Sequence, residues 1–111
     1  MKKEKCYLAN PDHSRKDKKV RRIINILKKR YEVINPFDTE KEICNRFNEK
    51  GYYPNCNQKL GEAIWRKDLR QIKECKLIVG YIPNRKVIGI IAELDYAFYL
   101  EKQIYVICSF N

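Results

Sequence analysis

The sequence predicts a small α/β protein, a parallel sheet of about four to five strands with helices on both faces. Short apolar runs typical of strands alternate along the chain with longer segments in which apolar residues recur at helical spacing. The resulting order, β-α-β-α-α-β-α-β, is typical of parallel strands joined by right-handed helical crossovers. The chain has 111 residues and shows no internal repeat or linker, so we expect residues 1–111 to form one domain.

The N-terminal half predicts two strands and two helices. A strand at Cys6–Ala9 ends at a turn, and Ser14 is placed to cap the helix that follows. Within Val20–Leu27 apolar residues recur at i, i+3, i+4 and i+7, with basic residues on the opposite face. A second strand is expected at Tyr31–Ile34, and a weaker helix at Asp38–Phe47.

The C-terminal half begins with a loop at Gly51–Asn57 and a long helix at Leu60–Cys75. Lys76–Ile82 is almost continuously apolar and predicts a buried strand. After a further loop, Ile88–Glu101 is apolar nearly all round, so we expect a well-buried helix. Gln103–Cys108 is the last strand. Ligands of such sheets bind at the carboxyl ends of the strands, which makes the segments after each strand the candidate site.

Composition narrows the functional classes. Lys and Arg number 24 against 14 Asp and Glu, a net charge of +10 that favours either a polyanionic ligand or a merely soluble surface. A hydrophobic content of 44% excludes global disorder, and the apolar runs are too short to span a bilayer. The five cysteines include no C-x-x-C pair, so we expect no disulfide framework, no metal site and a reducing, cytoplasmic location.

Two acidic residues stand where a carboxylate is unusual. On a helical projection, Asp68 falls within an apolar arc, whereas Lys67 falls outside it. Glu93 lies about one turn inside an apolar helix, where the positive end of the helix dipole favours an ionised carboxylate. Each acid has two interpretations, a structural one and a catalytic one as nucleophile, general base or cavity-facing acid. The apolar arc around Asp68 comprises Leu60, Ile64, Trp65, Leu69 and Ile72.

The turn at Asn10–Arg15 has the composition of a phosphate site. It joins a strand end to a helix start, where backbone N–H groups, Ser14 and Arg15 favour an anion. It contains no glycine, so it is neither a Walker loop nor a dinucleotide fingerprint. A capping turn with surface charge is the alternative interpretation.

Four motifs lie between Trp65 and Ile107: Lys67-Asp68-Leu69-x-x-Ile72, Leu77-Ile78-Val79-Gly80-Tyr81-Ile82-Pro83, Gly89-x-x-x-Glu93-Leu94-x-Tyr96-Ala97 and Lys102-x-x-Tyr105-Val106-Ile107. Together with an N-terminal anchor at Tyr7–Pro11, they resemble motifs of the nucleoside 2-deoxyribosyltransferases. The resemblance implies a flavodoxin-like α/β fold and cleavage or transfer at the N-glycosidic bond of a (deoxy)nucleoside or nucleoside monophosphate. It also implies a glutamate nucleophile and a glycosyl-enzyme intermediate.

The resemblance implies that Glu93 is the nucleophile, that Tyr7 orients it, and that Asp68 positions or protonates the base. No cofactor is implied, a homo-oligomer is expected, and nucleic acid becomes an unlikely partner because its case rests on charge alone. A nucleotide-binding module without turnover is the alternative function. The substrate-binding residues that we expect are Asn10, Ser14, Arg15, Pro36, Phe37, Tyr81 and Gly89.

Two departures from the family pattern bear on the substrate. Val87 stands where the transferases usually carry an Asp, six residues before the nucleophile, and the family often has a longer tail after the last strand. The related nucleoside 5′-monophosphate N-glycosidases also lack that Asp and hold phosphate with a Ser/Arg loop that Asn10–Arg15 loosely resembles. Together with Arg85 and Lys86, this loop favours a phosphorylated substrate, and transfer and hydrolysis both stay open.

Overall fold

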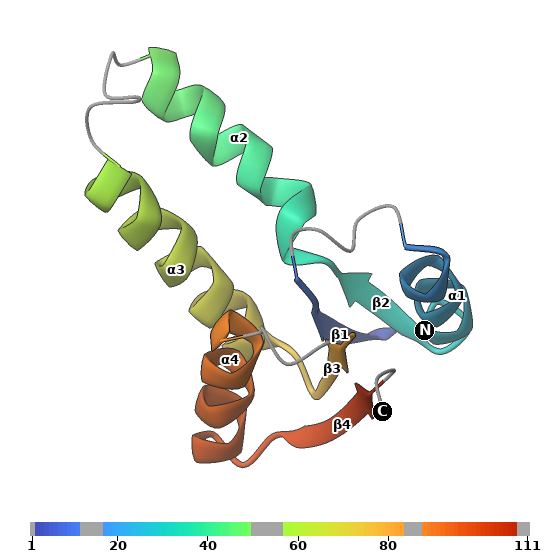
Figure 1. Ribbon diagram of the computed structural model, residues 1–111. Helices are drawn as coiled ribbons and strands as arrows, with labels where there is room; N and C mark the ends of the chain where they lie inside the picture. The colour runs from blue at the N-terminus through green and yellow to red at the C-terminus, as the bar shows by residue number, and fades with distance from the viewer. Residues whose placement is uncertain (1, 12–16, 50–56, 84–87, 109–111) are drawn as a thin grey trace.

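The computed structural model describes residues 2–11, 17–49, 57–83 and 88–108 (Figure 1). The element order is the predicted one. The predicted loop at Gly51–Asn57 lies outside the described residues, apart from Asn57, which begins a helix. The elements are β1 Glu4–Ala9, α1 Lys18–Leu27, β2 Tyr31–Ile34, α2 Pro36–Glu49, α3 Asn57–Glu74, β3 Leu77–Ile82, α4 Ile88–Tyr99 and β4 Gln103–Cys108.

The four strands form one parallel sheet in the order β2-β1-β3-β4. The chain passes from β1 to β2 on one side and then crosses to β3 on the other side of β1. The strand order therefore reverses between β1 and β3, and in open α/β sheets ligands bind in the crevice beside the carboxyl ends of such a pair. The predicted fold class is confirmed, and the expected ligand edge lies at the ends of β1 and β3.

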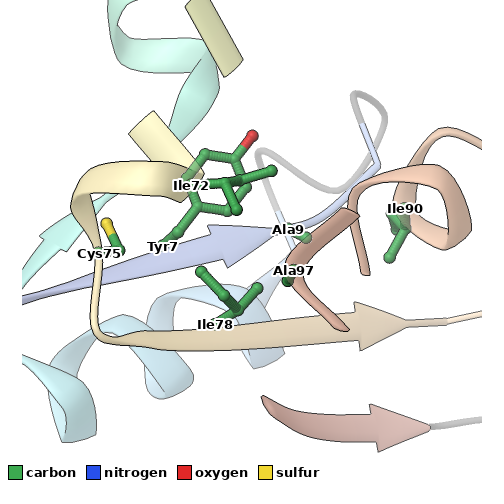
Figure 2. Close-up of a cluster of buried hydrophobic side chains, with 7 residues drawn as sticks. All are labelled: Tyr7, Ala9, Ile72, Cys75, Ile78, Ile90 and Ala97. Atoms are coloured by element: carbon green, nitrogen blue, oxygen red, sulfur yellow. The ribbon is translucent and has the colours of Figure 1, made fainter. Parts of the chain in front are cut away.

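Helices cover both faces of the sheet. Alternation along β1 places Cys6 and Leu8 on one face, where α1 packs against them through Val20. Tyr7 and Ala9 point to the other face, which α3 and α4 cover (Figure 2). Helix α2 packs along α3, and the two run side by side beyond the sheet (Figure 1). The core on the α3/α4 face comprises Tyr7, Ala9, Ile72, Cys75, Ile78, Ile90 and Ala97.

Two helix starts differ from the prediction. The N-cap of α1 is Asp17, whose side chain accepts a hydrogen bond from the backbone N–H of Lys19 at 2.8 Å; the predicted cap, Ser14, lies outside the described residues. Helix α2 begins at Pro36, two residues before the predicted start, because Asn35 caps it: the Phe37 N–H donates to Asn35 Oδ1 at 3.3 Å. Proline suits this first position because it needs no N–H donor there.

Helix α4 is buried on one side only, which corrects the prediction of a helix buried all round. Ile90, Glu93 and Ala97 face inward, whereas Ile88 is 85% exposed and Phe98 75%. The helix rests on the sheet by that single face, so a sequence that is apolar all round leaves its outer side in water. Among the described residues, no helix is both long enough and apolar enough to cross a membrane.

Gly80 of β3 sets how closely α4 approaches the sheet. A Cβ atom at this position would stand 3.0 Å from two side-chain carbons of Leu94, closer than such contacts normally allow. The missing side chain therefore lets α4 lie close against β3. This approach brings the inward face of α4, and with it Glu93, down onto β1.

Candidate functional site

The centre of the candidate site is a contact between β1 and α4. The side chain of Tyr7 stands on the α3/α4 face of β1 and is fully buried, and Glu93, the sixth residue of α4, is 7% exposed. The Tyr7 hydroxyl donates a hydrogen bond to Glu93 Oε2. Residues 86 positions apart in sequence thus form a buried phenol–carboxyl pair beside the switch point of the sheet.

Burial dominates the electrostatics of Glu93. Desolvation raises its pKa to about 7; the Tyr7 hydrogen bond and the charge of Lys67 act to lower it, and the Asp68 carboxylate acts to raise it further. This corrects the prediction that the helix dipole keeps the carboxylate ionised. The dipole effect fades within the first turn, and Glu93 lies beyond it. Close to neutral pH the carboxyl is therefore present in both protonation states.

Tyr7 stays a hydrogen-bond donor at physiological pH. Burial raises the pKa of its phenol far above the usual range, and the negative charges of Glu93 and Asp68 raise it further. A phenol that keeps its proton donates to a carboxylate whenever Glu93 is ionised. The pair is therefore built to hold the ionised carboxylate in one orientation.

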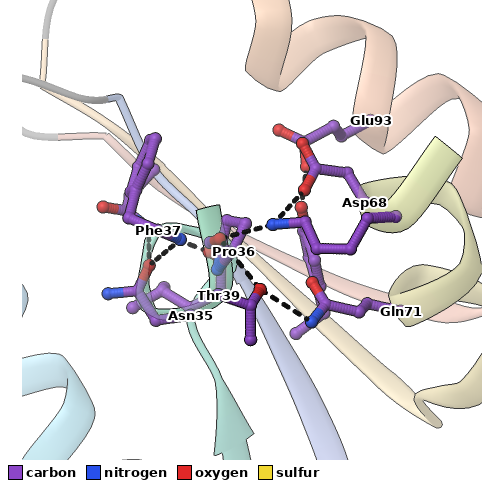
Figure 3. A network of polar contacts seen from close by, with 11 residues as sticks. Asn35, Pro36, Phe37, Thr39, Asp68, Gln71 and Glu93 are labelled. Carbon is purple, nitrogen blue, oxygen red and sulfur yellow. Dashed lines mark hydrogen bonds and ion pairs between the residues drawn. The ribbon is translucent and has the colours of Figure 1, made fainter. Parts of the chain in front are cut away.

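Helix α3 adds a second carboxyl and a cation. Burial raises the pKa of Asp68, while the hydrogen bond and the charge of Lys67 lower it. Lys67 Nζ lies 2.8 Å from Asp68 Oδ1 and also donates to the backbone oxygen of Pro36, at the start of α2. Figure 3 shows the carboxyl groups of Asp68 and Glu93 beside each other, and the Asp68 carboxyl also raises the pKa of Glu93. Lys67 joins Asp68 to Pro36 at the start of α2. The site thus holds two carboxyls and one buried ammonium.

Lys67 is the residue that the sequence analysis missed. It was assigned to the outer side of α3, yet it is 8% exposed, whereas Trp65, assigned to the apolar arc, is 40% exposed. The predicted arc was centred too close to Trp65, so Lys67 fell outside it. The inward face can be found by counting steps of three and four residues from Leu60 without regard to the polarity of each residue, and this count includes Lys67. The buried and half-buried positions that follow this spacing are Leu60, Ile64, Lys67, Asp68, Gln71 and Ile72 on α3, and Cys75 just after it.

A polar network extends from Lys67 along the ligand edge of the sheet (Figure 3). Asn10, just after β1, is 3% exposed; its Nδ2 donates to the Leu8 oxygen at 2.9 Å and contacts Asn35 Oδ1 at 3.4 Å. Asn35 caps α2, whose first residue, Pro36, accepts the Lys67 bond. Side chains and backbone from β1, α2, α3 and α4 are therefore tied together beside the strand ends.

The structure brings most of the predicted site residues together. Glu93, Tyr7 and Asp68 form the centre, and Asn10, Pro36 and Phe37 line the adjoining edge. Gly89 lies one helical turn before Glu93 on the same side of α4, is exposed, and has open space where its Cβ would be.

Other predicted residues are not part of this cluster. Tyr81 is buried on the opposite, α1 face of the sheet, where its hydroxyl donates to Asp17 Oδ2 at 2.9 Å. Strand alternation separates it from Tyr7, because the two side chains stand on opposite faces. Ser14, Arg15 and Val87 lie outside the described residues. Among the residues that are described, no group of three or more His, Cys, Asp or Glu side chains could hold a metal ion.

Comparisons with known proteins give one kind of match. No family model and no curated protein sequence matches this chain, but solved structures do. A 2-deoxyribosyltransferase from Bacillus psychrosaccharolyticus superposes with a TM-score of 0.69 at 21% identity, covering 94% of this chain and 72% of that one. A 2-deoxyribosyltransferase from Leishmania mexicana gives 0.60 at 18% identity, covering 95% and 64%. A CMP N-glycosidase from Clostridium botulinum gives 0.57 at 23% identity, covering 95% and 71%.

The chain has the 2-deoxyribosyltransferase fold. The resemblance in sequence motifs therefore agrees with a similarity in three-dimensional structure. The similar structures include two 2-deoxyribosyltransferases and one N-glycosidase that acts on a nucleoside monophosphate. The chain spans less than two thirds of the length of the Leishmania enzyme. At 18–23% identity, the match shows the 2-deoxyribosyltransferase fold, whereas the chemistry depends on the residues of the site.

Proposed function

We propose that this protein cleaves or transfers at the N-glycosidic bond of a (deoxy)nucleoside or nucleoside monophosphate, with Glu93 as the nucleophile. The observation that carries the proposal is the buried Glu93 carboxyl, held by the Tyr7 hydroxyl beside the switch point of the sheet. A buried acid with a raised pKa and a fixed partner at a ligand edge is typical of catalytic groups. The fold shared with nucleoside-processing enzymes supports the same substrate class.

The first step forms a glycosyl-enzyme. Tyr7 occupies Glu93 Oε2, so Oε1 is the oxygen left to attack the anomeric carbon. A C–O bond forms between Oε1 and that carbon while the bond from the carbon to the base nitrogen breaks, and the bonding electrons leave with the base. The carboxylate must be ionised to attack, and a pKa of about 7 keeps a large ionised fraction near neutral pH.

The second carboxyl serves the leaving group. Asp68 lies beside Glu93, and burial raises its pKa, which favours a protonated carboxyl that donates to the departing base. Lys67 opposes that shift through its ion pair, and its bond to Pro36 fixes where the pair stands. Lys67 is thus a positioning residue that balances the protonation of both acids.

The second step releases the sugar. Water or the nitrogen of an acceptor base attacks the anomeric carbon, and the Asp68 carboxylate takes the proton that the attacking group loses. The bond to Glu93 breaks, and the Glu93 carboxylate is restored. Water gives hydrolysis and a second base gives transfer, so the same residues support both outcomes. The loop at Asn10–Arg15 favours a 5′-phosphate on the sugar through the side chains of Ser14 and Arg15.

Base release tests the proposal directly. We would incubate the protein with a panel of nucleosides, deoxynucleosides and their 5′-monophosphates, and follow free base by chromatography. We expect release from at least one member, and a loss of about a thousandfold or more in Glu93→Gln, because a glutamine cannot act as the nucleophile. Release that is undiminished in Glu93→Gln would overturn the assignment of Glu93.

The alternative is a module that binds a nucleotide without turnover. It predicts that a nucleotide raises the melting temperature while no base appears, in the wild type as in Glu93→Gln. Asp95→Asn is the matched control, because Asp95 is an exposed acid two residues along the same helix. This variant keeps wild-type base release if the proposal is right.

Two further predictions accompany the proposal. The expected homo-oligomer is supported by the exposed apolar side chains of Ile88, Ile91, Phe98 and Tyr99 on α4, a surface that a second copy would cover. Light scattering on the purified protein would test it, and a monomer at all concentrations would contradict it. The cytoplasmic location stays a prediction.

A further inference from the structure

The positive charge of this protein is concentrated at one end of the sequence. Residues 1–30 contain 12 basic and 3 acidic residues, whereas residues 31–111 contain 12 and 11. Nearly all of the net charge of +10 therefore belongs to the first two elements and their connections. From Lys18 to Arg30 there are seven basic residues and no acidic one. The enzyme site proposed above does not use these residues.

The structure places four of these seven cations along the outer side of α1 and the turn that follows it. A shallow groove of about 380 Å³ lies along that helix and is lined by four cations, one amide and one aliphatic side chain. All six lining residues are exposed, and among the described residues no ion pair involves any of the four cations. The lining residues are Lys18, Arg21, Arg22, Asn25, Ile26 and Lys29.

The opposite side of α1 is committed to the core. Val20 is 1% exposed, and Ile23, Ile24 and Leu27 pack with it against the α1 face of the sheet. The helix is therefore held against the sheet by one side, and its other side is exposed and basic. It has no free apolar face to insert into a lipid surface, which amphipathic membrane helices require.

Against the expectation from the family resemblance, we propose that the basic groove on α1 binds the phosphate backbone of nucleic acid, on the opposite face of the sheet from the Tyr7–Glu93 pair. Helix α1 is ten residues, or about 15 Å, long, which spans four to five phosphates of one strand at roughly 3.4 Å each. Lys18 and Arg22 stand one turn apart on the same side, as do Arg21 and Asn25. Such a row matches a line of phosphates with no need for base contacts.

The groove lacks the features of sequence recognition. Its lining includes no aromatic side chain on which a base could stack, and a single amide, Asn25, that could read a base edge. Binding is therefore expected to be electrostatic and independent of sequence. With four phosphates neutralised, affinity for duplex falls about a hundredfold between 50 and 200 mM salt.

Fluorescence anisotropy with fluorescein-labelled DNA and RNA duplexes, each two helical turns long, tests the proposal on the full chain. The test variant, called the α1 variant below, is Arg21→Gln/Arg22→Gln/Lys29→Gln, with two changes in α1 and one in the turn that follows it. The matched control is Arg66→Gln/Arg70→Gln/Lys73→Gln, which removes two arginines and one lysine from exposed positions on α3 and so lowers the net charge equally. Melting temperatures establish that both variants fold.

We expect the α1 variant to bind at least one duplex about tenfold or more weakly, with a salt slope lower by about one per cation removed, while the α3 variant stays near the wild type. Equal weakening in both variants would overturn the proposal, because net charge alone would then explain the binding. So would failure of the wild type to bind either duplex at 50 mM salt. Wild-type binding to phosphatidylserine vesicles without binding to duplex would overturn it as well.

Discussion

The two faces of the sheet are built from the same strands but from different chemistry. On the α1 face, β1 contributes Cys6 and Leu8 to a core whose buried members are apolar apart from the phenol of Tyr81. On the α3/α4 face, the residue between them, Tyr7, meets a buried carboxyl, and Lys67 lies nearby. Among the described residues, the buried side chains of acidic or basic residues are those of Lys67 and Glu93, and both lie on that second face.

This difference separates stability from function. Apolar burial on the α1 face stabilises the fold without reference to pH. On the α3/α4 face, desolvation of Glu93 and Asp68 raises both pKa values and costs stability when the groups ionise. A substitution on the α1 face should therefore change the free energy of unfolding by the same amount at every pH. A substitution of a titrating group on the α3/α4 face should change it by an amount that depends on pH.

Leu8→Ala should produce the largest loss of stability. Leu8 is fully buried on the α1 face, and truncating a leucine in a core costs about 3 kcal/mol through lost burial and the cavity left behind. Urea denaturation at several pH values measures it. We expect the same loss at each pH, whereas a loss that grows or shrinks with pH would show that the two faces are not independent.

Glu93→Gln should stabilise the protein as pH rises. An ordinary unfolded Glu titrates near 4.5, whereas the folded group titrates at about 7, so between these values the unfolded chain has lost a proton that the folded chain keeps. The free energy of unfolding of the wild type therefore falls across this window, by about 3 kcal/mol in all. The glutamine variant lacks this fall and should become the more stable protein above pH 7. Parallel stability curves from pH 5 to 8 would contradict it.

Tyr7→Phe should shift the acid limb of the pH–rate profile to higher pH. The Tyr7 hydrogen bond lowers the pKa of Glu93, so its removal raises that pKa above about 7, and a higher pH is needed to ionise the nucleophile. Loss of a hydrogen bond to a charged group should also reduce kcat/KM at neutral pH by about ten- to a hundredfold. The profile of kcat/KM against pH measures both, and a limb that stays put or moves down would exclude the role given to Tyr7.

Lys67→Met should have a similar but smaller effect on the same limb. Its charge lowers the pKa of both Glu93 and Asp68, and for Glu93 it counts for less than the Tyr7 hydrogen bond. The change also removes one of the two side-chain hydrogen bonds to the Pro36 oxygen, which still accepts from the Thr39 hydroxyl at 3.4 Å, so the loss of stability should be about 1 kcal/mol. Lys67→Arg is the control that keeps the charge. If the arginine variant shifts the limb as far as the methionine variant does, charge is not the cause.

Much of the architecture could be predicted because it depends on local patterns. The strand at Lys76–Ile82 and the helix at Leu60–Cys75 follow from continuous and periodic apolar spacing, and the structure places β3 and α3 there with small shifts at the ends. Asp68 and Glu93 stood out for the same reason, as acids inside apolar segments. The pairing of Glu93 with Tyr7 depends on the close approach of α4 over Gly80, a tertiary fact that only the motif resemblance anticipated.

The errors arose where the environment of a side chain depends on its neighbours in space. The exposed side of α4 looks like core in sequence because nothing local tells a helix packed on two sides from one packed on one side. Lys67 looks like surface because a buried lysine needs partners from other elements, here the Pro36 oxygen on α2. The raised pKa of Glu93 follows from burial that the helix-dipole argument ignored.

The most direct test of the central claim is to identify the residue that carries the sugar during the reaction. A 2′-deoxy-2′-fluoronucleoside, or its 5′-monophosphate, slows both steps, since the fluorine disfavours positive charge at the anomeric carbon, and it lets the intermediate be quenched in acid. Peptide mass spectrometry should then find one sugar on the peptide that contains Glu93, and none in Glu93→Gln. A sugar on another residue, or base released by Glu93→Gln at the wild-type rate, would contradict the account.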